Sequence, residues 1–211
     1  MAGFVLKSPG PMDTVLFDLG KVLLDWSPRY FYARFFAGDE AGLERFLGEV
    51  VATEWIASMD AGLPMAEAIP ARQRLFPQDA GLIARWREGW PEMLRGEIAG
   101  TVEVLEALAA RGTRLFALTN FSRETWPIAR ARFGFLDRFE DVVVSGEVGL
   151  VKPDPRIYRL AIERCRLEPA RTVFVDDLPA NVAAACAEGL HGLHFTAPER
   201  LRADLAALGL L

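Results

Sequence analysis

The sequence predicts an α/β protein, in which a doubly wound parallel sheet carries a small inserted all-α domain. From residue 98 onward, short runs rich in Val, Leu and Phe alternate with helical segments. This alternation is typical of a parallel sheet covered by helices on both faces. Residues 28–96 instead show apolar residues at helical spacing, with no β-branched run between them. They predict a helical insert.

The first predicted strand is Val15–Phe17, and Asp18 follows it directly. Gly20 then allows the backbone to turn at once, and residues 25–29 are predicted to form a second turn. Four or five helices should follow, with turns near residues 38–39, 62–64 and 77–78. The predicted domains are therefore a discontinuous core of residues 12–27 plus 97–211, and a helical cap of residues 28–96.

The rest of the core alternates helix and strand. Thr101 is a candidate N-cap, and Gly112 and Gly189 are candidate helix ends. The crossovers between parallel strands should be right-handed. We predict helices over residues 101–111, 123–133, 155–166, 179–188 and 198–208, and strands over residues 114–119, 142–145, 172–176 and 191–195.

Composition narrows the classes of partner. The chain has 211 residues, 51% of them hydrophobic, and a net charge of −5 without a long basic cluster. Nucleic acid and anionic membranes bind clustered Lys and Arg, so neither is an expected partner. No apolar run approaches the roughly 20 residues of a membrane span. An acidic two-domain protein of this kind is expected to be a monomer or a homodimer.

The N-terminal residues and the two cysteines predict the cellular compartment of the protein. Met1–Pro11 lacks the pattern of a signal peptide and should be a loose leader. Cys165 and Cys186 form neither a disulfide framework nor a zinc spacing, so they should be reduced thiols packed in helices. These features predict a cytoplasmic protein.

Polar residues follow the predicted strands where each strand ends. Asp18 ends the first strand, Thr119 and Asn120 end the second, a loop from the third leads to Lys152, and Asp176 and Asp177 end the fourth. Ligands of such sheets bind beyond the carboxyl ends of the strands. Taken alone, Asp18 could be a structural acid with a fixed cationic partner, but this convergence favours an active site.

Three neighbouring carboxylates require a cation among them. Oxygen ligands favour a hard ion, and Mg²⁺ binds one or two carboxylates while keeping water and substrate phosphate. Asp18 and Asp177 are the expected direct ligands. The Gly20 carbonyl is a possible third ligand, and Asp176 is expected to act directly or through water.

The remaining groups suit an anion. The Thr119 hydroxyl, the Asn120 backbone N–H and the Lys152 ammonium could bind a phosphoryl group and present its phosphorus to Asp18. The Asp18 carboxylate could then attack and form an aspartyl-phosphate. Individually, Thr119 could be a helix cap and Lys152 a solvated loop lysine.

This set of motifs resembles the haloacid dehalogenase superfamily of hydrolases, in the subfamily with a helical cap after the first motif. The resemblance covers nearly the whole chain from Asp13 onward. It implies a Rossmann-like core, a nucleophile at Asp18, Mg²⁺ at Asp18, Gly20, Asp176 and Asp177, and an Asn181 that orients the acidic pair. The motifs that carry it are Phe17–Val22, Leu118–Asn120, Lys152–Pro155 and Val175–Asn181.

One position departs from the family pattern. Phosphatases of this superfamily usually carry a second Asp two residues after the nucleophile, as general acid and base, and here that position is Gly20. Such help is worth roughly 10²–10⁴-fold in rate. A sugar-phosphatase branch resembles this chain in carrying Asp-Leu-Gly together with the Asp-Asp pair. Lys21 also differs from the Gly or Asn expected there, and its role stays open.

The resemblance leaves three functions in competition. The leading one is a Mg²⁺-dependent phosphomonoesterase that acts on a small soluble phosphometabolite, with sugar phosphates as the expected class. The second is a 2-haloacid dehalogenase, although such enzymes need no metal and have little reason to keep the two acids. The third is a non-catalytic binding protein that lost turnover with the acid at position 20. Trp26 and Arg29, beside the entry to the cap, are candidate substrate contacts.

Overall fold

The computed structural model describes residues 10–211, so most of the predicted leader lies outside the described residues. Five parallel strands form one sheet in the order β5-β4-β1-β6-β7, which confirms the predicted α/β class. Because β1 is the middle strand, the residue after it lies between the ends of β4 and β6. The strands are β1 (Thr14–Phe17), β4 (Arg114–Thr119), β5 (Asp141–Val144), β6 (Thr172–Asp176) and β7 (His191–His194).

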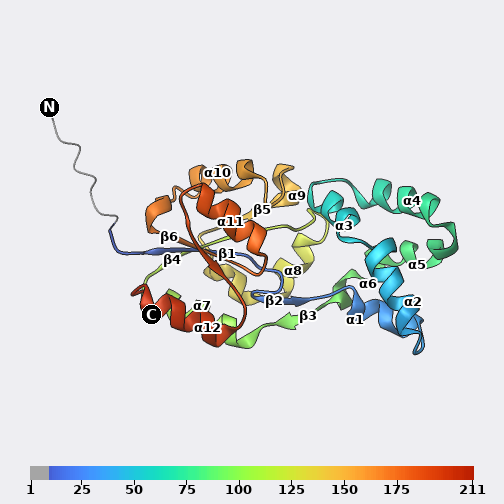
Figure 1. Cartoon of the computed structure of the whole chain (residues 1–211), viewed down its shortest axis with the longest axis horizontal. Helices are drawn as coiled ribbons and strands as arrows, with labels where there is room; N and C mark the ends of the chain where they lie inside the picture. The colour runs from blue at the N-terminus through green and yellow to red at the C-terminus, as the bar shows by residue number, and fades with distance from the viewer. Residues whose placement is uncertain (1–9) are drawn as a thin grey trace.

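Helices cover both faces of this sheet (Figure 1). Val15 and Phe17 belong to a buried cluster that includes side chains of α7 and α12, whereas Leu16 belongs to a second cluster with side chains of α10. Successive strand residues point to opposite faces, so one short strand supports two cores. The helices around the sheet are α7 (Ala99–Ala110), α8 (Trp126–Arg132), α9 (Ser145–Val148), α10 (Pro155–Arg164), α11 (Pro179–Ala187) and α12 (Pro198–Ala207).

The helices of the insert lie together beside the core (Figure 1). There are six α-helices where four or five were predicted, because α1 and α5 have only four and five residues and are too short to show a hydrophobic repeat. They are α1 (Arg29–Tyr32), α2 (Glu40–Arg45), α3 (Thr53–Asp60), α4 (Met65–Leu75), α5 (Ala80–Ala84) and α6 (Trp86–Met93). The proposed domain boundaries stay a prediction.

A two-stranded antiparallel ribbon connects the insert to the core. It consists of β2 (Leu24–Trp26) and β3 (Leu94–Glu97), with an irregular register between Asp25 and Trp26. The sequence predicted a turn over residues 25–29 and a helical pattern from residue 28 to about residue 95. The turn prediction was wrong at Asp25 and Trp26, and the helical prediction was wrong at Leu94 and Arg95. The two strands are very short and lie far apart in the chain, so neither shows a recognisable strand pattern.

The predicted helix ends are partly confirmed. Gly112 and Gly189 adopt φ of +77° and +87° beyond α7 and α11, as helix-ending glycines do. Thr101 is not an N-cap, because α7 already begins at Ala99 and the Thr101 hydroxyl has no hydrogen-bond partner among residues 10–211. Within the same range, no helix is both long and apolar enough to cross a bilayer.

Candidate active site

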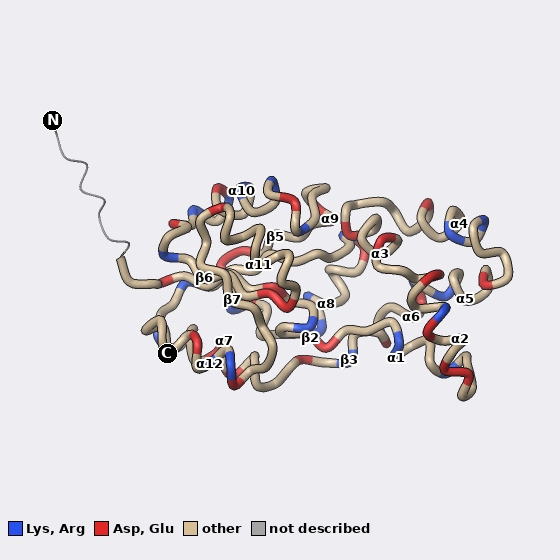
Figure 2. The backbone as a smooth tube through the Cα atoms, viewed as in Figure 1, with Lys and Arg blue, Asp and Glu red and all other residues tan. Residues whose placement is uncertain are grey.

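The carboxyl ends of the three central strands carry the predicted polar residues side by side. Asp18 follows β1, Asp176 and Asp177 close β6 on one side, and Thr119 ends β4 on the other. Figure 2 shows acidic positions where the sheet faces the helical insert. Thr119 is buried and is not a helix cap, because α8 begins only at Trp126. Its hydroxyl makes no hydrogen bond to the described residues, so it is available to a ligand.

Lys152 joins two of these carboxylates. Its ammonium Nζ lies 2.9 Å from Asp18 Oδ1 and 2.7 Å from Asp176 Oδ2, and its side chain is only 1% exposed. Asn120 positions the lysine, since its Nδ2 donates to the Lys152 carbonyl at 3.0 Å and its Oδ1 accepts from the Lys152 N–H at 2.8 Å. Lys152 is therefore part of the site and not a solvated loop lysine.

The Asp176 carboxylate is fully buried and held from several sides. Asn181, in the first turn of α11, donates from Nδ2 to Oδ1 at 2.9 Å and to Oδ2 at 3.1 Å. The Leu178 backbone N–H donates to Oδ1 at 2.8 Å. A buried charge is tolerated only with such partners. Asn181 thus contacts Asp176, one of the two acids that it was predicted to orient. Asp176 in turn holds the Lys152 ammonium.

The three acids form one cluster. Asp18, Asp176 and Asp177 each offer a carboxylate oxygen within 4.8 Å of the others. Burial raises the pKa of Asp18 to about 6; Lys152 opposes this shift and Asp176 adds to it. Burial and the Asp176 charge also raise the pKa of Asp177, and Lys21 acts against them. An all-oxygen donor set whose charges repel fits a hard divalent ion such as Mg²⁺.

The turn after Asp18 contains two unusual residues, Gly20 and Lys21. A Cβ on Gly20 would meet no atom within 4 Å, so packing does not exclude a side chain there. Lys21 adopts φ of +58°, in the left-handed region that favours Gly or Asn. The exposed Lys21 charge partly opposes the rise in the pKa of Asp177, so this lysine adds positive charge near the acidic cluster.

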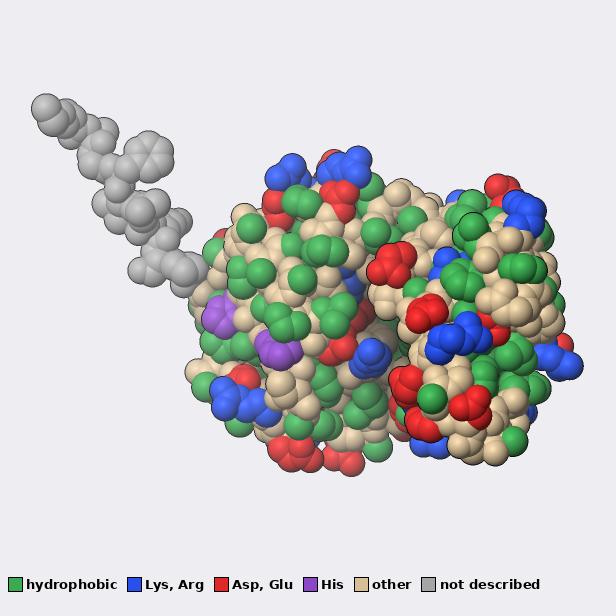
Figure 3. All heavy atoms as spheres, turned by 45° about the vertical axis from the view of Figure 1, so that its right-hand side comes forward, with side chains coloured by type: hydrophobic (Ala, Val, Ile, Leu, Met, Phe, Trp, Pro, Cys, Tyr) green, Lys and Arg blue, Asp and Glu red, His purple; other side chains and the backbone are tan. Residues whose placement is uncertain are grey.

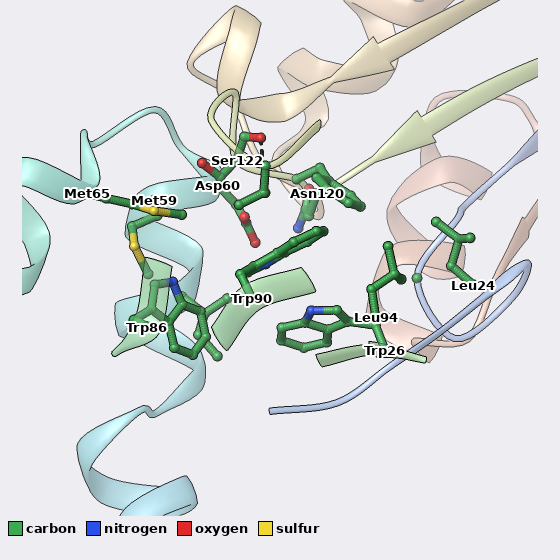
Figure 4. Close-up of a pocket in the computed structure, with 14 residues that line it drawn as sticks. Leu24, Trp26, Met59, Asp60, Met65, Trp86, Trp90, Leu94, Asn120 and Ser122 are labelled. Carbon is green, nitrogen blue, oxygen red and sulfur yellow. Dashed lines mark hydrogen bonds between the residues drawn. The ribbon is translucent and has the colours of Figure 1, made fainter. Parts of the chain in front are cut away.

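A largely apolar pocket of about 90 Å³ lies between the strand ends and the insert. Trp26 on β2 and Trp86 and Trp90 on α6 form part of its wall, and Gly20 and Asn120 bring it close to the acidic cluster (Figure 4). Figure 3 shows the hollow between the core and the insert, with acidic and basic side chains at its edge. A ligand of this site would contact aromatic surface beyond its charged end.

Only one of the two predicted substrate contacts reaches this pocket. Trp26 lines it, and its indole Nε1 is buried without a hydrogen-bond partner in residues 10–211. Arg29 does not line it. Its guanidinium lies 2.7 Å from Glu40 and also pairs with Glu44, because α1 directs it toward α2.

The loop after β4 packs very closely against α9. The Phe121 N–H donates to Ser145 Oγ at 2.8 Å, and the Gly146 N–H donates to the Phe121 carbonyl at 3.0 Å. A Cβ on Gly146 would lie 2.5 Å from the Arg123 backbone nitrogen. Glycine is therefore required at this contact, which places the loop at the edge of the pocket.

Sequence reasoning missed Asp60, the last residue of α3, which lines the pocket from the insert. Ser145 Oγ donates to its backbone carbonyl at 2.7 Å and so links insert and core. The sequence did contain an indication that Asp60 is unusual. A carboxylate at a helix C-terminus opposes the helix dipole, and no Lys or Arg occurs over residues 61–71 to compensate it.

Comparison with known proteins gives a consistent family. A family model described as a haloacid dehalogenase-like hydrolase matches residues 12–189. A phosphorylated carbohydrates phosphatase of Thermotoga maritima is 29% identical over 191 residues, which cover 87% of this chain and 84% of that protein. Acyl-CoA dehydrogenase family member 10 of Mus musculus is 34% identical over 112 residues, but these cover 50% of this chain and only 10% of that protein.

Solved structures share the fold. A family enzyme of Bacteroides thetaiotaomicron, in complex with magnesium and inorganic phosphate, has a TM-score of 0.65 at 18% identity and covers 88% of this chain and 95% of its own. The L-2-haloacid dehalogenase of Xanthobacter autotrophicus, with covalently bound chloropropionic acid, has a TM-score of 0.66 at 18% identity, with coverage of 93% and 83%.

Proposed function

Since the chain belongs to the haloacid dehalogenase-like hydrolase family, we propose that it is a Mg²⁺-dependent phosphomonoesterase of a small phosphorylated metabolite. One observation carries the proposal. The buried Lys152 ammonium contacts both Asp18 and Asp176 beside a pocket that Gly20 and Asn120 help to line. This contact holds a carboxylate and a cation together where a phosphate ester would enter.

The residues present fit a magnesium ion. Asp18, Asp177 and the Gly20 carbonyl would hold it directly, and Asp176 directly or through water, because these groups offer only oxygen donors. When bound, the ion would offset the repulsion among the carboxylates and the charge of a phosphoryl group. The magnesium and phosphate in the Bacteroides structure support this assignment.

Each remaining residue has a definite task in the proposed reaction. The Asp18 carboxylate attacks phosphorus, the ester bond to the leaving oxygen breaks, and water later hydrolyses the aspartyl-phosphate. Lys152, the Thr119 hydroxyl and the Asn120 backbone N–H bind the phosphoryl oxygens and stabilise their charge. Asn181 acts through Asp176, which it holds in place for Lys152.

Two substrate classes have support. Sugar phosphates come first, because the Thermotoga relative is a phosphatase of phosphorylated carbohydrates. A phosphate ester with an apolar or aromatic leaving group is the second candidate. Trp26, Trp86 and Trp90 in the pocket lining favour this second class, because flat apolar groups bury well against indole rings. Trp26 contributes to either class, since sugar rings also present apolar faces.

A panel of phosphate esters, tested with Mg²⁺ titrated from zero, decides the function. We expect metal-dependent phosphate release that the Asp18→Asn variant loses. Halide release from 2-haloacids that persists in chelator would instead establish the dehalogenase, the activity of the Xanthobacter neighbour. Ligand binding without product, equal in wild type and Asp18→Asn, would establish a non-catalytic binding protein.

The broader biological context follows from composition. We propose a cytoplasmic monomer or homodimer with a small-molecule substrate and no nucleic-acid or membrane partner, because the net charge is −5 and basic residues are dispersed. Sedimentation of the purified protein would give the oligomeric state. Cell fractionation would give the location.

A further inference from the structure

The carboxylate of Asp60 faces the active-site pocket from the insert. Asp60 ends α3 and lines the same pocket as Gly20 and Asn120, which flank the acidic cluster. In Figure 4 it projects into the pocket toward Asn120 and Trp90. The charge of Asp18 adds to the rise in the pKa of Asp60, so the two carboxylates lie within electrostatic reach of one another.

The position of Asp60 is well defined by the core. Ser145 Oγ donates to its backbone carbonyl at 2.7 Å, and the Ser122 backbone N–H lies close enough to its carboxylate to act on its pKa. Gly146, next to Ser145, packs directly on the loop that contains Ser122, with its N–H 3.0 Å from the Phe121 carbonyl. Residues of the core therefore orient an acid that belongs to the insert.

Nothing in the described structure compensates this carboxylate with a full positive charge. None of the ion pairs within residues 10–211 includes Asp60, and the α3 dipole presents its negative end there. Burial raises the pKa of Asp60 to about 7; the Ser122 N–H opposes this shift and the Asp18 charge adds to it. An acid of this kind is protonated in part at neutral pH, as general acid–base catalysis requires.

The space beside the nucleophile is open on the side where Asp60 lies. A Cβ on Gly20 would meet no atom within 4 Å, so the pocket has room where a carboxyl group at position 20 would stand. Gly20 and Asp60 line one continuous space from opposite domains. A leaving group held in that space would have Asp60 as its neighbouring acid.

We propose that Asp60 is the general acid and base of the reaction, in place of the carboxyl group that Gly20 lacks. As Asp18 attacks phosphorus and the ester P–O bond breaks, Asp60 donates its proton to the leaving oxygen and becomes a carboxylate. It then accepts a proton from the water that attacks the aspartyl-phosphate, so that the alcohol and inorganic phosphate leave and Asp60 is protonated again. This inference rests on the proposed phosphomonoesterase function.

The test compares two aryl phosphates of similar shape. Dinitrophenyl phosphate has a leaving group that departs without a proton, whereas phenyl phosphate needs one. The ratio kcat/KM reports the steps up to cleavage of the ester bond. We expect Asp60→Asn to lower kcat/KM for phenyl phosphate by about 10²–10⁴-fold and to leave the value for dinitrophenyl phosphate nearly unchanged.

Two further variants separate catalysis from structure. Glu54→Gln replaces an exposed carboxylate on the same helix and should leave kcat/KM unchanged for both esters. Gly20→Asp should fit without a clash and should restore phenyl phosphate turnover to the Asp60→Asn protein by at least tenfold. Thermal unfolding of each variant checks that the fold is intact.

The outcomes distinguish the inference from the function on which it rests. A wild type that hydrolyses neither ester at any Mg²⁺ concentration overturns the proposed function and the inference with it. An active wild type whose Asp60→Asn variant loses both esters equally, or neither, overturns the inference alone. In that case Asp60 serves only to join the insert to the core.

Discussion

Replacing Lys152 with methionine removes the ammonium that lies 2.9 Å from Asp18 and 2.7 Å from Asp176 while keeping an unbranched apolar side chain. Two buried carboxylates would then face each other without that cation. Breaking a buried ion pair on one side costs about 3–5 kcal/mol, a large share of the roughly 5–15 kcal/mol by which a domain is stable. We expect the loss to lie near the upper figure, because one lysine serves two acids.

Urea denaturation followed by circular dichroism measures this loss. With a slope of about 2 kcal/mol per molar urea, a loss of about 5 kcal/mol lowers the midpoint by about 2.5 M in metal-free buffer. Saturating Mg²⁺ should reduce the difference in urea midpoint between the variant and the wild type, because the ion can neutralise the same carboxylates. Turnover should fall by at least 10²-fold, since the phosphoryl group loses its fixed cation.

Lys21→Met is the matched control. It also removes one lysine charge near the acids, but Lys21 is exposed, and surface substitutions usually change stability by less than about 0.5 kcal/mol. Equal midpoints for Lys152→Met and wild type in metal-free buffer would show that Lys152 does not stabilise the two acids, and the electrostatic reasoning would be refuted.

Three further predictions concern the turn, the loop and the insert. Lys21→Gly should raise the free energy of unfolding by about 1 kcal/mol in a urea titration, because glycine adopts the φ of +58° without strain. Gly146→Ala should lower turnover at least tenfold, because its Cβ would lie 2.5 Å from the Arg123 nitrogen and displace the loop. The pKa of Asp60 rises on folding from its ordinary 3.8 to about 7. Folding then favours the protonated carboxyl group. As the pH rises from about 4 to 7, the free energy of unfolding of the wild type should therefore fall relative to that of Asp60→Asn, by up to about 4 kcal/mol without metal.

The three central strands could be predicted because each is a largely apolar run with a polar residue at or just after its carboxyl end. Val15–Phe17 and Thr172–Asp176 are both wholly buried, so no alternation was needed to recognise either strand. The ribbon of β2 and β3 could not be predicted, because its pairing depends on where the insert brings the chain back. The local sequence pattern does not show where the chain comes back to pair with β2.

The polar groups at the strand ends were predictable for the same reason that the sheet was. Once Asp18, Thr119 and Asp176 end parallel strands, topology alone brings them to one edge. Asp60 and Arg29 were not predictable in this way, because they lie on the insert. Their placement depends on the packing of helices against the core, which no strand order determines. Arg29 therefore pairs within the insert, and Asp60 enters the pocket.

The ribbon of β2 and β3 limits how the pocket can open. Both chain crossings between core and insert are backbone-paired to each other, so one cannot slide along the other without breaking those hydrogen bonds. We therefore expect the pocket to open by rotation of the insert about this ribbon. On the far side of the pocket, Glu124 acts as a latch, because it accepts from the Met65 N–H at 2.7 Å and pairs with Arg87.

This arrangement makes the β2–β3 ribbon the hinge and the Glu124 contacts the latch, at separate parts of the pocket wall. Trp26 belongs to the hinge itself, so its ring stays near the ligand while the insert turns. Asp60 belongs to the swinging part and leaves when the latch opens. The moving insert thus carries Asp60, and we expect this acid to stand in the site only while the insert is closed.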